Sequence, residues 1–224
     1  MKLVHPDFLF QIEFEESKIT NIIIESPTIF ENVICELYSQ VLGNEGMWVL
    51  SENSTPMEIK KHSEIILNPF DLDINNKRIL AKLYDNIKNN VISTDLYIKW
   101  NQMYPHVVEV IEAFIGDFDY NLEYDDEIEI KEFLKLLNLR FTIDSVNSLE
   151  KIIDYMNLHN SILGTKLFVL VNIKSFYQQE KLQYLYEQAF YKKYKLLLIE
   201  NKEYGKRNNN EIRYIIDKDG CVIS

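Results

Sequence analysis

Eight carboxylates lie between residues 117 and 132, and the chain has no lysine or arginine between Lys99 and Lys131. Such crowding of negative charge is unfavourable unless cations occupy it. Carboxylate oxygens spread over a loop and a helix start suit Ca²⁺ better than a soft metal, although EF-hand spacing is absent. The same acids would also stabilise a helix N-terminus or hold the two metal ions of a nuclease. The eight are Asp117, Asp119, Glu123, Asp125, Asp126, Glu127, Glu129 and Glu132.

A second group of residues is basic and has helical spacing. At about 100° per residue, residues 74–91 form a helix with four cations and Asp85 on one face and only apolar or tyrosine side chains on the other. Lysines without a base-reading motif suit contacts to phosphates rather than sequence readout. A solvated face of a packing helix is the alternative. The candidate DNA-contacting residues are Lys77, Arg78, Lys82 and Lys88, with Lys60 and Lys61 earlier in the chain.

Motifs for nucleotide binding and catalysis are missing from the sequence. A P-loop needs GxxxxGK[ST] between a strand and a helix, but the first such junction is Glu25-Ser26-Pro27, without glycine or lysine. The apolar run 167–171 ends at Asn172, where an NTPase strand would offer a metal-binding carboxylate. The sequence has no GxGxxG, and its four histidines are isolated. We therefore expect no nucleotide and no catalytic residue.

The net charge of −11 argues at first against a nucleic-acid partner, but the charges are segregated. Residues 59–99 hold seven basic and five acidic side chains, whereas residues 100–130 hold nine acidic and no basic ones. Surface charges further apart than about 8–10 Å are screened from one another. Local fields therefore decide the partner more than the total charge does.

The hydrophobic period changes along the chain. These changes predict the strands and helices that must position the residues above. Residues 8–15 and 18–24 are predicted to form a β-hairpin, and a helix from Pro27 to about residue 42 follows, with Ser26 as its N-cap. Residues 74–92, 94–116 and 127–137 are predicted to be helices, the second interrupted or kinked at Pro105. Beyond them a strand at 140–143 is expected. Further predicted elements are strands at 47–50, 64–67, 167–173, 195–199 and 211–217, and helices at 147–161 and 178–192.

Apolar strands alternating with helices predict an α/β fold with a mostly parallel sheet. The all-helical stretch interrupts this pattern, so we expect an α/β head at residues 1–68 and 138–224 with an inserted helical leg at residues 69–137. The longest fully apolar run, 167–171, is far too short to span a membrane. Two cysteines without metal-site spacing, Cys35 and Cys221, are typical of reduced thiols in a cytoplasmic protein.

Four stretches in this order resemble the short form of the type II-A CRISPR adaptation protein family. They are residues 11–24 (QIEFEESKITNIII), 63–84 (SEIILNPFDLDINNKRILAKLY), 122–142 (LEYDDEIEIKEFLKLLNLRFT) and 149–201, with KLFVLVNI and KLLLIEN as its core strands. The resemblance covers nearly the whole chain. It implies an NTPase-like head that lacks nucleotide motifs, with an inserted helical leg.

The resemblance further implies a homotetrameric ring, stabilised by Ca²⁺, whose basic channel encloses the ends of double-stranded DNA without sequence preference. Such a protein supports spacer acquisition beside the CRISPR integrase and effector nuclease and catalyses nothing itself. The match carries Glu123, Asp125 or Asp126, and Glu132 onto the calcium region, and Lys82 onto a helix of the leg. A metal-dependent nuclease that uses residues 117–132 and a protein-only scaffold of the adaptation complex are the two alternatives.

Overall fold

The computed structural model describes residues 1–8, 10–116, 118–125, 128–142, 145, 147–205 and 208–223. The chain forms two compact units, which we call the head (Met1–Leu72 with Ile143–Ser224) and the leg (Asp73–Thr142). The sequence predicts the inserted leg at residues 69–137, and in the structure this unit spans residues 73–142.

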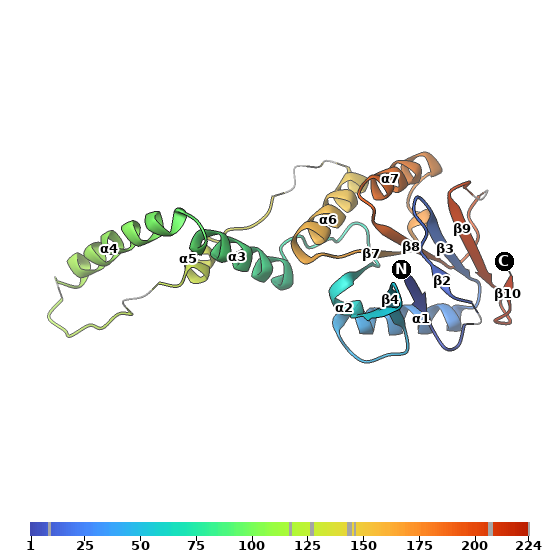
Figure 1. Ribbon diagram of the computed structural model, residues 1–224, viewed down its shortest axis with the longest axis horizontal. Helices are drawn as coiled ribbons and strands as arrows, with labels where there is room; N and C mark the ends of the chain where they lie inside the picture. Colours follow the sequence, from blue (N-terminus) through green and yellow to red (C-terminus); the bar gives the residue numbers. More distant parts are fainter. Residues whose placement is uncertain are drawn as a thin grey trace. The chain divides into compact units, whose positions relative to one another are not determined.

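A six-stranded sheet forms the centre of the head (Figure 1). Its strand order is β10-β9-β3-β8-β7-β6, and only β10 runs antiparallel to its neighbour. The predicted α/β fold with a mostly parallel sheet is therefore confirmed. The strands are β3 (Ile19–Ile24), β6 (Ser63–Ile66), β7 (Leu167–Val171), β8 (Lys195–Glu200), β9 (Glu211–Ile216) and β10 (Val222–Ile223).

Helices cover both faces of this sheet, because its central strands are apolar on both sides. Every residue of β3 and of β7 is buried. The helix α1 (Pro27–Leu42) lies on one face, and α6 (Ser148–Leu163) and α7 (Gln179–Tyr191) lie on the other (Figure 1). As predicted, α1 has Pro27 in its first turn, and it ends at Gly43 in the left-handed conformation, φ 103°. The Ser26 side chain, however, makes no capping hydrogen bond.

A smaller antiparallel sheet, of order β2-β1-β4-β5, packs beside α1. Its strand pairing differs from that of the predicted hairpin. The segment β2 (Ile12–Glu13) pairs with β1 (Lys2–Val4), whereas β3 lies in the other sheet between β8 and β9. The prediction of a hairpin over residues 8–24 is wrong because both edges of β3 are already occupied by parallel strands. The remaining strands are β4 (Val49–Glu52) and β5 (Thr55–Met57), and the short helix α2 (Ile59–His62) leads into β6.

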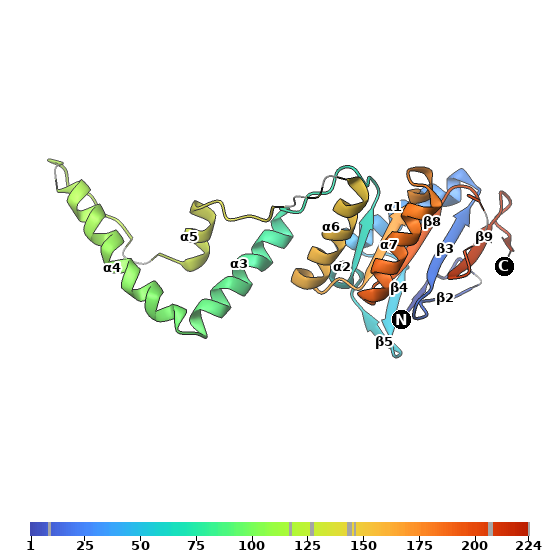
Figure 2. The same ribbon diagram turned by 90° about the horizontal axis from the view of Figure 1, so that it is seen from above.

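The leg consists of α3 (Lys77–Ile92), α4 (Leu96–Ile115) and α5 (Ile130–Leu136) (Figure 2). Pro105 lies inside α4, which continues through it, so of the predicted interruption or kink the interruption is wrong. Residues 140–142 are not a strand, contrary to the prediction, because the Asn75 side chain takes up the backbone hydrogen bonds of Phe141. Within the described residues, no helix is both long and apolar enough to cross a membrane.

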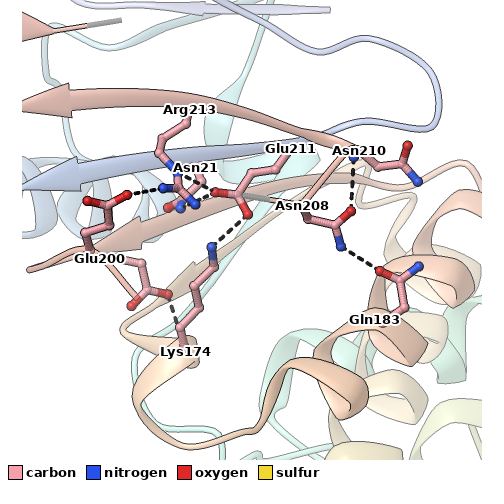
Figure 3. Close-up of polar contacts among 9 residues, drawn as sticks. Asn21, Lys174, Gln183, Glu200, Asn208, Asn210, Glu211 and Arg213 are labelled. Carbon is pink, nitrogen blue, oxygen red and sulfur yellow. Dashed lines mark hydrogen bonds and ion pairs between the residues drawn. The ribbon is translucent and has the colours of Figure 1, made fainter. Parts of the chain in front are cut away.

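A buried polar network lies on the face of the head sheet that α7 covers (Figure 3). At its centre, the Glu211 carboxylate accepts hydrogen bonds from Asn21 Nδ2 at 2.8 Å, Lys174 Nζ at 2.8 Å and Arg213 Nε at 2.9 Å. Burial by itself raises the pKa of Glu211, but the bonds from Asn21, Lys174 and Arg213 outweigh it and leave the pKa lowered. Glu211 is therefore held as a carboxylate.

Glu200, at the end of β8, is in the opposite situation. Its side chain is 0% exposed, and burial raises its pKa to about 7, although the Lys174 backbone N–H donates to Oε1 at 3.1 Å. Its Oε2 has no hydrogen-bond partner among the described residues. At a pH between about 4.3, the pKa of the unfolded chain, and about 7, the raised pKa, the Glu200 carboxyl is therefore protonated in the folded head. In the unfolded chain it is ionised at the same pH.

This difference predicts a pH-dependent effect of Glu200→Gln. Between about pH 4.5 and 7 the native state holds the extra proton, so stability falls as pH rises, by at most about 1.4 kcal/mol per pH unit. A glutamine at position 200 cannot ionise, so the variant does not lose stability in this way as the pH rises. Urea unfolding of both proteins at pH 5 and pH 8 should show the variant gaining about 1–3 kcal/mol relative to the wild type at the higher pH. Parallel pH profiles would contradict the burial of an ionisable Glu200.

Candidate nucleic-acid interface

The helix α3 has the two faces that its sequence predicts. The Asn76 side chain accepts hydrogen bonds from the backbone N–H groups of Arg78 and Ile79, both at 3.1 Å, and so fixes where the helix begins. Ile79 and Tyr84 are buried, 0% and 6% exposed, on the apolar face. The apolar face is thereby used for packing, and the cations of the other face point away from it.

Lys77 and Lys82 are the most accessible cations of this face. Both are exposed, and neither forms an ion pair with another described residue. Arg78 is half-buried and lies between them in the sequence. These side chains are long and flexible, as contacts with a phosphate backbone require.

Two ion pairs connect the C-terminal half of α3 to α5. Lys88 Nζ lies 2.7 Å from Glu129 Oε2, and Lys131 pairs with Asp85. The hydrogen bonds from the two lysines hold the pKa values of both carboxyls below their usual range. Lys88 therefore already has an ion-pair partner, Glu129. The helical spacing of the sequence did not predict this pair.

The structure places the two remaining predicted cations in the other unit. Lys60 and Lys61 lie on α2 of the head and are exposed, and Lys61 Nζ is 2.5 Å from Glu58 Oε1. The predicted DNA-contacting residues are thus divided into a head pair and a leg group.

The predicted calcium ligands are only partly described. Glu123 and Asp125 are exposed, Glu132 lies on α5 with Lys135 Nζ 2.6 Å from its Oε1, and Asp126 lies outside the described residues, as do Asp117 and Glu127. Within the described ranges, no three Asp, Glu, His or Cys side chains stand close enough together to hold a metal ion. The oxygen donors suit Ca²⁺ chemically, but the described ones do not form a complete ligand set.

The two junctions at which an NTPase would bind phosphate and metal carry Glu25-Ser26-Pro27 and Asn172. Glu25-Ser26-Pro27 joins β3 to α1. Asn172 follows β7 in the left-handed conformation, φ 52°, and its Oδ1 accepts a hydrogen bond from the Asn201 backbone at 3.0 Å. Asn172 is thus used to bind a neighbouring loop.

Two contacts that the sequence did not predict hold the end of the leg against α3. The Asn75 amide bonds both backbone groups of Phe141, accepting from its N–H at 2.9 Å and donating to its carbonyl at 3.0 Å. The Tyr84 hydroxyl donates to the Leu139 carbonyl at 2.8 Å. These bonds replace the strand pairing that was expected at 140–143.

A comparison with known protein families identifies the family of this chain. The model of the CRISPR-associated protein family Cas_Csn2 matches residues 40–220. Among solved structures, a putative ABC transporter (ATP-binding protein) from Pyrococcus furiosus is similar to the chain with a TM-score of 0.40. Its sequence identity is 8%, over 91% of this chain and 88% of that one.

The anchoring role of Asn75 predicts a local loss of stability in Asn75→Ala. Removing the amide leaves two partly buried backbone groups of Phe141 without partners, which should destabilise the leg by about 1–3 kcal/mol. Hydrogen exchange of peptides from α3 should quicken, while that of β7 in the head stays unchanged. Asn86→Ala, at an exposed position of α3, is the matched control. Equal exchange in the two variants would contradict the anchor.

Proposed function

The chain belongs to the Cas_Csn2 family of CRISPR-associated proteins, which supports a role in CRISPR adaptation, and on this premise we propose that it binds double-stranded DNA ends without reading their sequence. In this proposal it acts as a calcium-stabilised homotetrameric ring beside the CRISPR integrase and effector nuclease, and it has no catalytic activity of its own.

The observation that carries the DNA-binding proposal is the polar face of α3. Lys77 and Lys82 are exposed cations without an ion-pair partner among the described residues, and they lie in a chain whose net charge is −11. Lysines attract phosphates of any sequence and release their counterions. A ring that carries its cations inward and its acids outward concentrates attraction in the channel and keeps DNA off the outer surface.

Self-association is supported by apolar surface on the leg. None of the 20 residues of α4 is buried, although the helix is rich in apolar side chains. Ile98 is 58% exposed, Val110 50% and Phe114 67%. Exposed apolar residues on one helix are unfavourable in water and are typical of surfaces that another chain covers. Further copies of the same chain are the occupants that we propose.

Calcium is proposed to neutralise the acidic segment of the leg. Glu123, Asp125 or Asp126, and Glu132 would supply hard oxygen ligands of the kind that Ca²⁺ prefers. The bound ion would relieve repulsion among acids that have few basic neighbours in sequence. Glu129 and Asp85 lie outside the proposed set and bind Lys88 and Lys131, whereas Glu132 would have to exchange its contact with Lys135 for the ion.

The absence of catalysis is proposed from the residues at the two NTPase-like junctions. Glu25 would repel a phosphate after β3, and the Asn172 amide after β7 is a poorer metal ligand than a carboxylate. A nuclease would need several acids converging on one accessible site, and the described acids Asp85 and Glu129 bind lysines instead.

The DNA-binding proposal predicts the behaviour of a charge-reversal variant. Lys77→Glu, Arg78→Glu and Lys82→Glu together should abolish duplex binding in a gel-shift assay, because phosphate contacts are replaced by repulsion. Wild-type affinity should fall with salt, with a logarithmic slope near 0.9 per phosphate neutralised, and differ little between sequences.

The matched control carries the same charge change on the head, at exposed Lys181, Lys192 and Lys218. This control variant should retain most of the wild-type affinity, and both variants should keep the wild-type oligomer in sedimentation. Full binding by the leg variant, or equal loss in both, would show that α3 is not the DNA-binding surface.

The calcium proposal predicts an EDTA-sensitive assembly. Wild-type protein should sediment as a larger species in calcium than in EDTA, because removing the ion restores carboxylate repulsion in the leg. Glu123→Ala with Asp126→Ala should give a weaker oligomer that no longer responds to EDTA. Glu16→Ala with Asp219→Ala, two exposed acids of the head, should respond as the wild type does. Identical wild-type profiles in calcium and EDTA would refute a structural role for the ion.

A further inference from the structure

A cavity of about 260 Å³ opens on the head beside α1. Its walls come from the connection between β1 and β2, from α1, and from β9 and β10 with the turn that joins them. Leu9, the one undescribed residue within these segments, carries no charge. The volume far exceeds the ~10–15 Å³ that one water needs and is below the range of drug-sized sites, about 300–1,000 Å³. It therefore suits one long side chain.

The floor of the cavity is apolar. Val33 and Ile216 are buried, and Ile29 and Val222 are half-buried. Gly220 is in the left-handed conformation, φ 82°, and brings the turn between β9 and β10 close to α1, since a Cβ at this position would lie 3.4 Å from Ile29 Cδ1. A ligand in the cavity would thus bury apolar surface between α1 and this turn.

One wall of the cavity holds a carboxylate that is fixed in place but keeps its charge. Glu36 Oε1 accepts a hydrogen bond from the Met47 backbone N–H at 2.6 Å, and its Oε2 accepts one from His5 Nε2 at 2.9 Å. His5 Nδ1 accepts from the Asp7 backbone N–H at 3.2 Å, which requires a neutral ring. No described lysine or arginine pairs with Glu36, whose side chain is 29% exposed. The carboxylate is therefore accessible to a cation.

A second carboxylate lies at the rim, and the surrounding face is acidic. The Asp7 side chain lines the same cavity and is 81% exposed. Residues 19–59, which include all of α1, contain six glutamates and no lysine or arginine. Lys218, in the turn between β9 and β10, lies between Asp217 and Asp219 in the sequence. The negative field thus extends beyond the cavity along α1.

A cation on a long apolar stem fits this combination of floor and rim. Arginine and lysine pack their methylene stems on apolar surface and keep the charged group at a polar edge. A guanidinium also stacks on aromatic rings and binds carboxylates through its fork of N–H donors. Phe8 supplies such a ring in the cavity, and its centroid lies 5.4 Å from those of both His5 and Trp48. Arginine is therefore the side chain that uses the most of this wall.

We propose that the cavity docks an arginine side chain of a basic protein segment that lies across the acidic face of α1. A segment with several cations gains from exposed acids outside the cavity, such as Glu31, which a single small cation does not reach. The same acids repel DNA phosphates, so this surface is separate from the basic face of α3. The proposal does not depend on DNA binding.

The test uses a synthetic peptide of alternating lysine and glycine with one central arginine. Its control peptide has citrulline, which has the same shape without the charge, in place of the arginine. In calorimetry the wild-type protein should bind the arginine peptide about tenfold more tightly than the citrulline peptide, the effect of one charge-assisted contact. The affinity should also fall as salt is added.

Two variants at exposed positions of the cavity locate the binding site. Asp7→Asn removes a rim charge, and Asn32→Lys places a cation on the α1 wall. Each should weaken binding of the arginine peptide about tenfold. Glu180→Gln, on α7 across the sheet from α1 (Figure 1), and Asn209→Lys, before the start of β9, make the same charge changes at exposed positions away from the cavity. These controls should bind as the wild type does, and thermal unfolding checks that every variant is folded.

Four results would overturn the proposal. They are no peptide binding to the wild type, equal affinity for the arginine and citrulline peptides, cavity variants that bind like their controls, and displacement of the peptide by spermidine at equal concentration, which would make a small cation the ligand. A changed sedimentation profile in Asn32→Lys would also contradict it, because the face would then join copies of this chain. Blunt-duplex affinity should be unchanged in both cavity variants and reports the proposed function separately.

Discussion

Burial of β3 on both faces is the constraint on which the rest of the head depends. All six of its residues are buried, so each face of the sheet must be covered by other parts of the chain. α1 covers one face, and α6 and α7 cover most of the other (Figure 1). Within the described residues the connection from β8 to β9 contains no helix, and on that side of the sheet the buried network around Glu211 supplies polar contacts. The leg is inserted after β6, an edge strand, so it leaves the order of the sheet intact.

The leg is held together differently, because it has little buried surface of its own. α3 buries Ile79 and Tyr84, α5 buries Ile130, and α4 buries no residue. Hydrogen bonds from Asn75 and Tyr84 to the backbone, and ion pairs between α3 and α5, take the place of a core. One helix thus has two tasks: its apolar face stabilises the leg, and its exposed lysines provide the surface proposed for DNA. A unit with so small a core has much to gain from contacts with further copies of itself.

Sequence patterns predicted those features that are encoded locally. The Pro27 start and Gly43 end of α1, the buried strands β7 and β8, and the two faces of α3 all follow from periodicity and end signals over a few residues. The hairpin at 8–24 was wrong because alternation does not reveal which strands lie on either side of β3. Contacts between distant residues were missed: Asn75 and Phe141 are 66 positions apart, and Asn21 and Glu211 are 190 apart. No pattern within one segment reports a partner so far along the chain.

In the proposed function, a ring of these chains takes DNA in through an end. The most direct measurement is the affinity of the wild-type protein, in calcium, for linear duplex and for covalently closed circles of the same sequence and length. A ring threads over an end, so linear DNA should bind more tightly, and cutting the circles once should restore the affinity. Equal affinity for linear and closed DNA would contradict end-dependent loading of a ring.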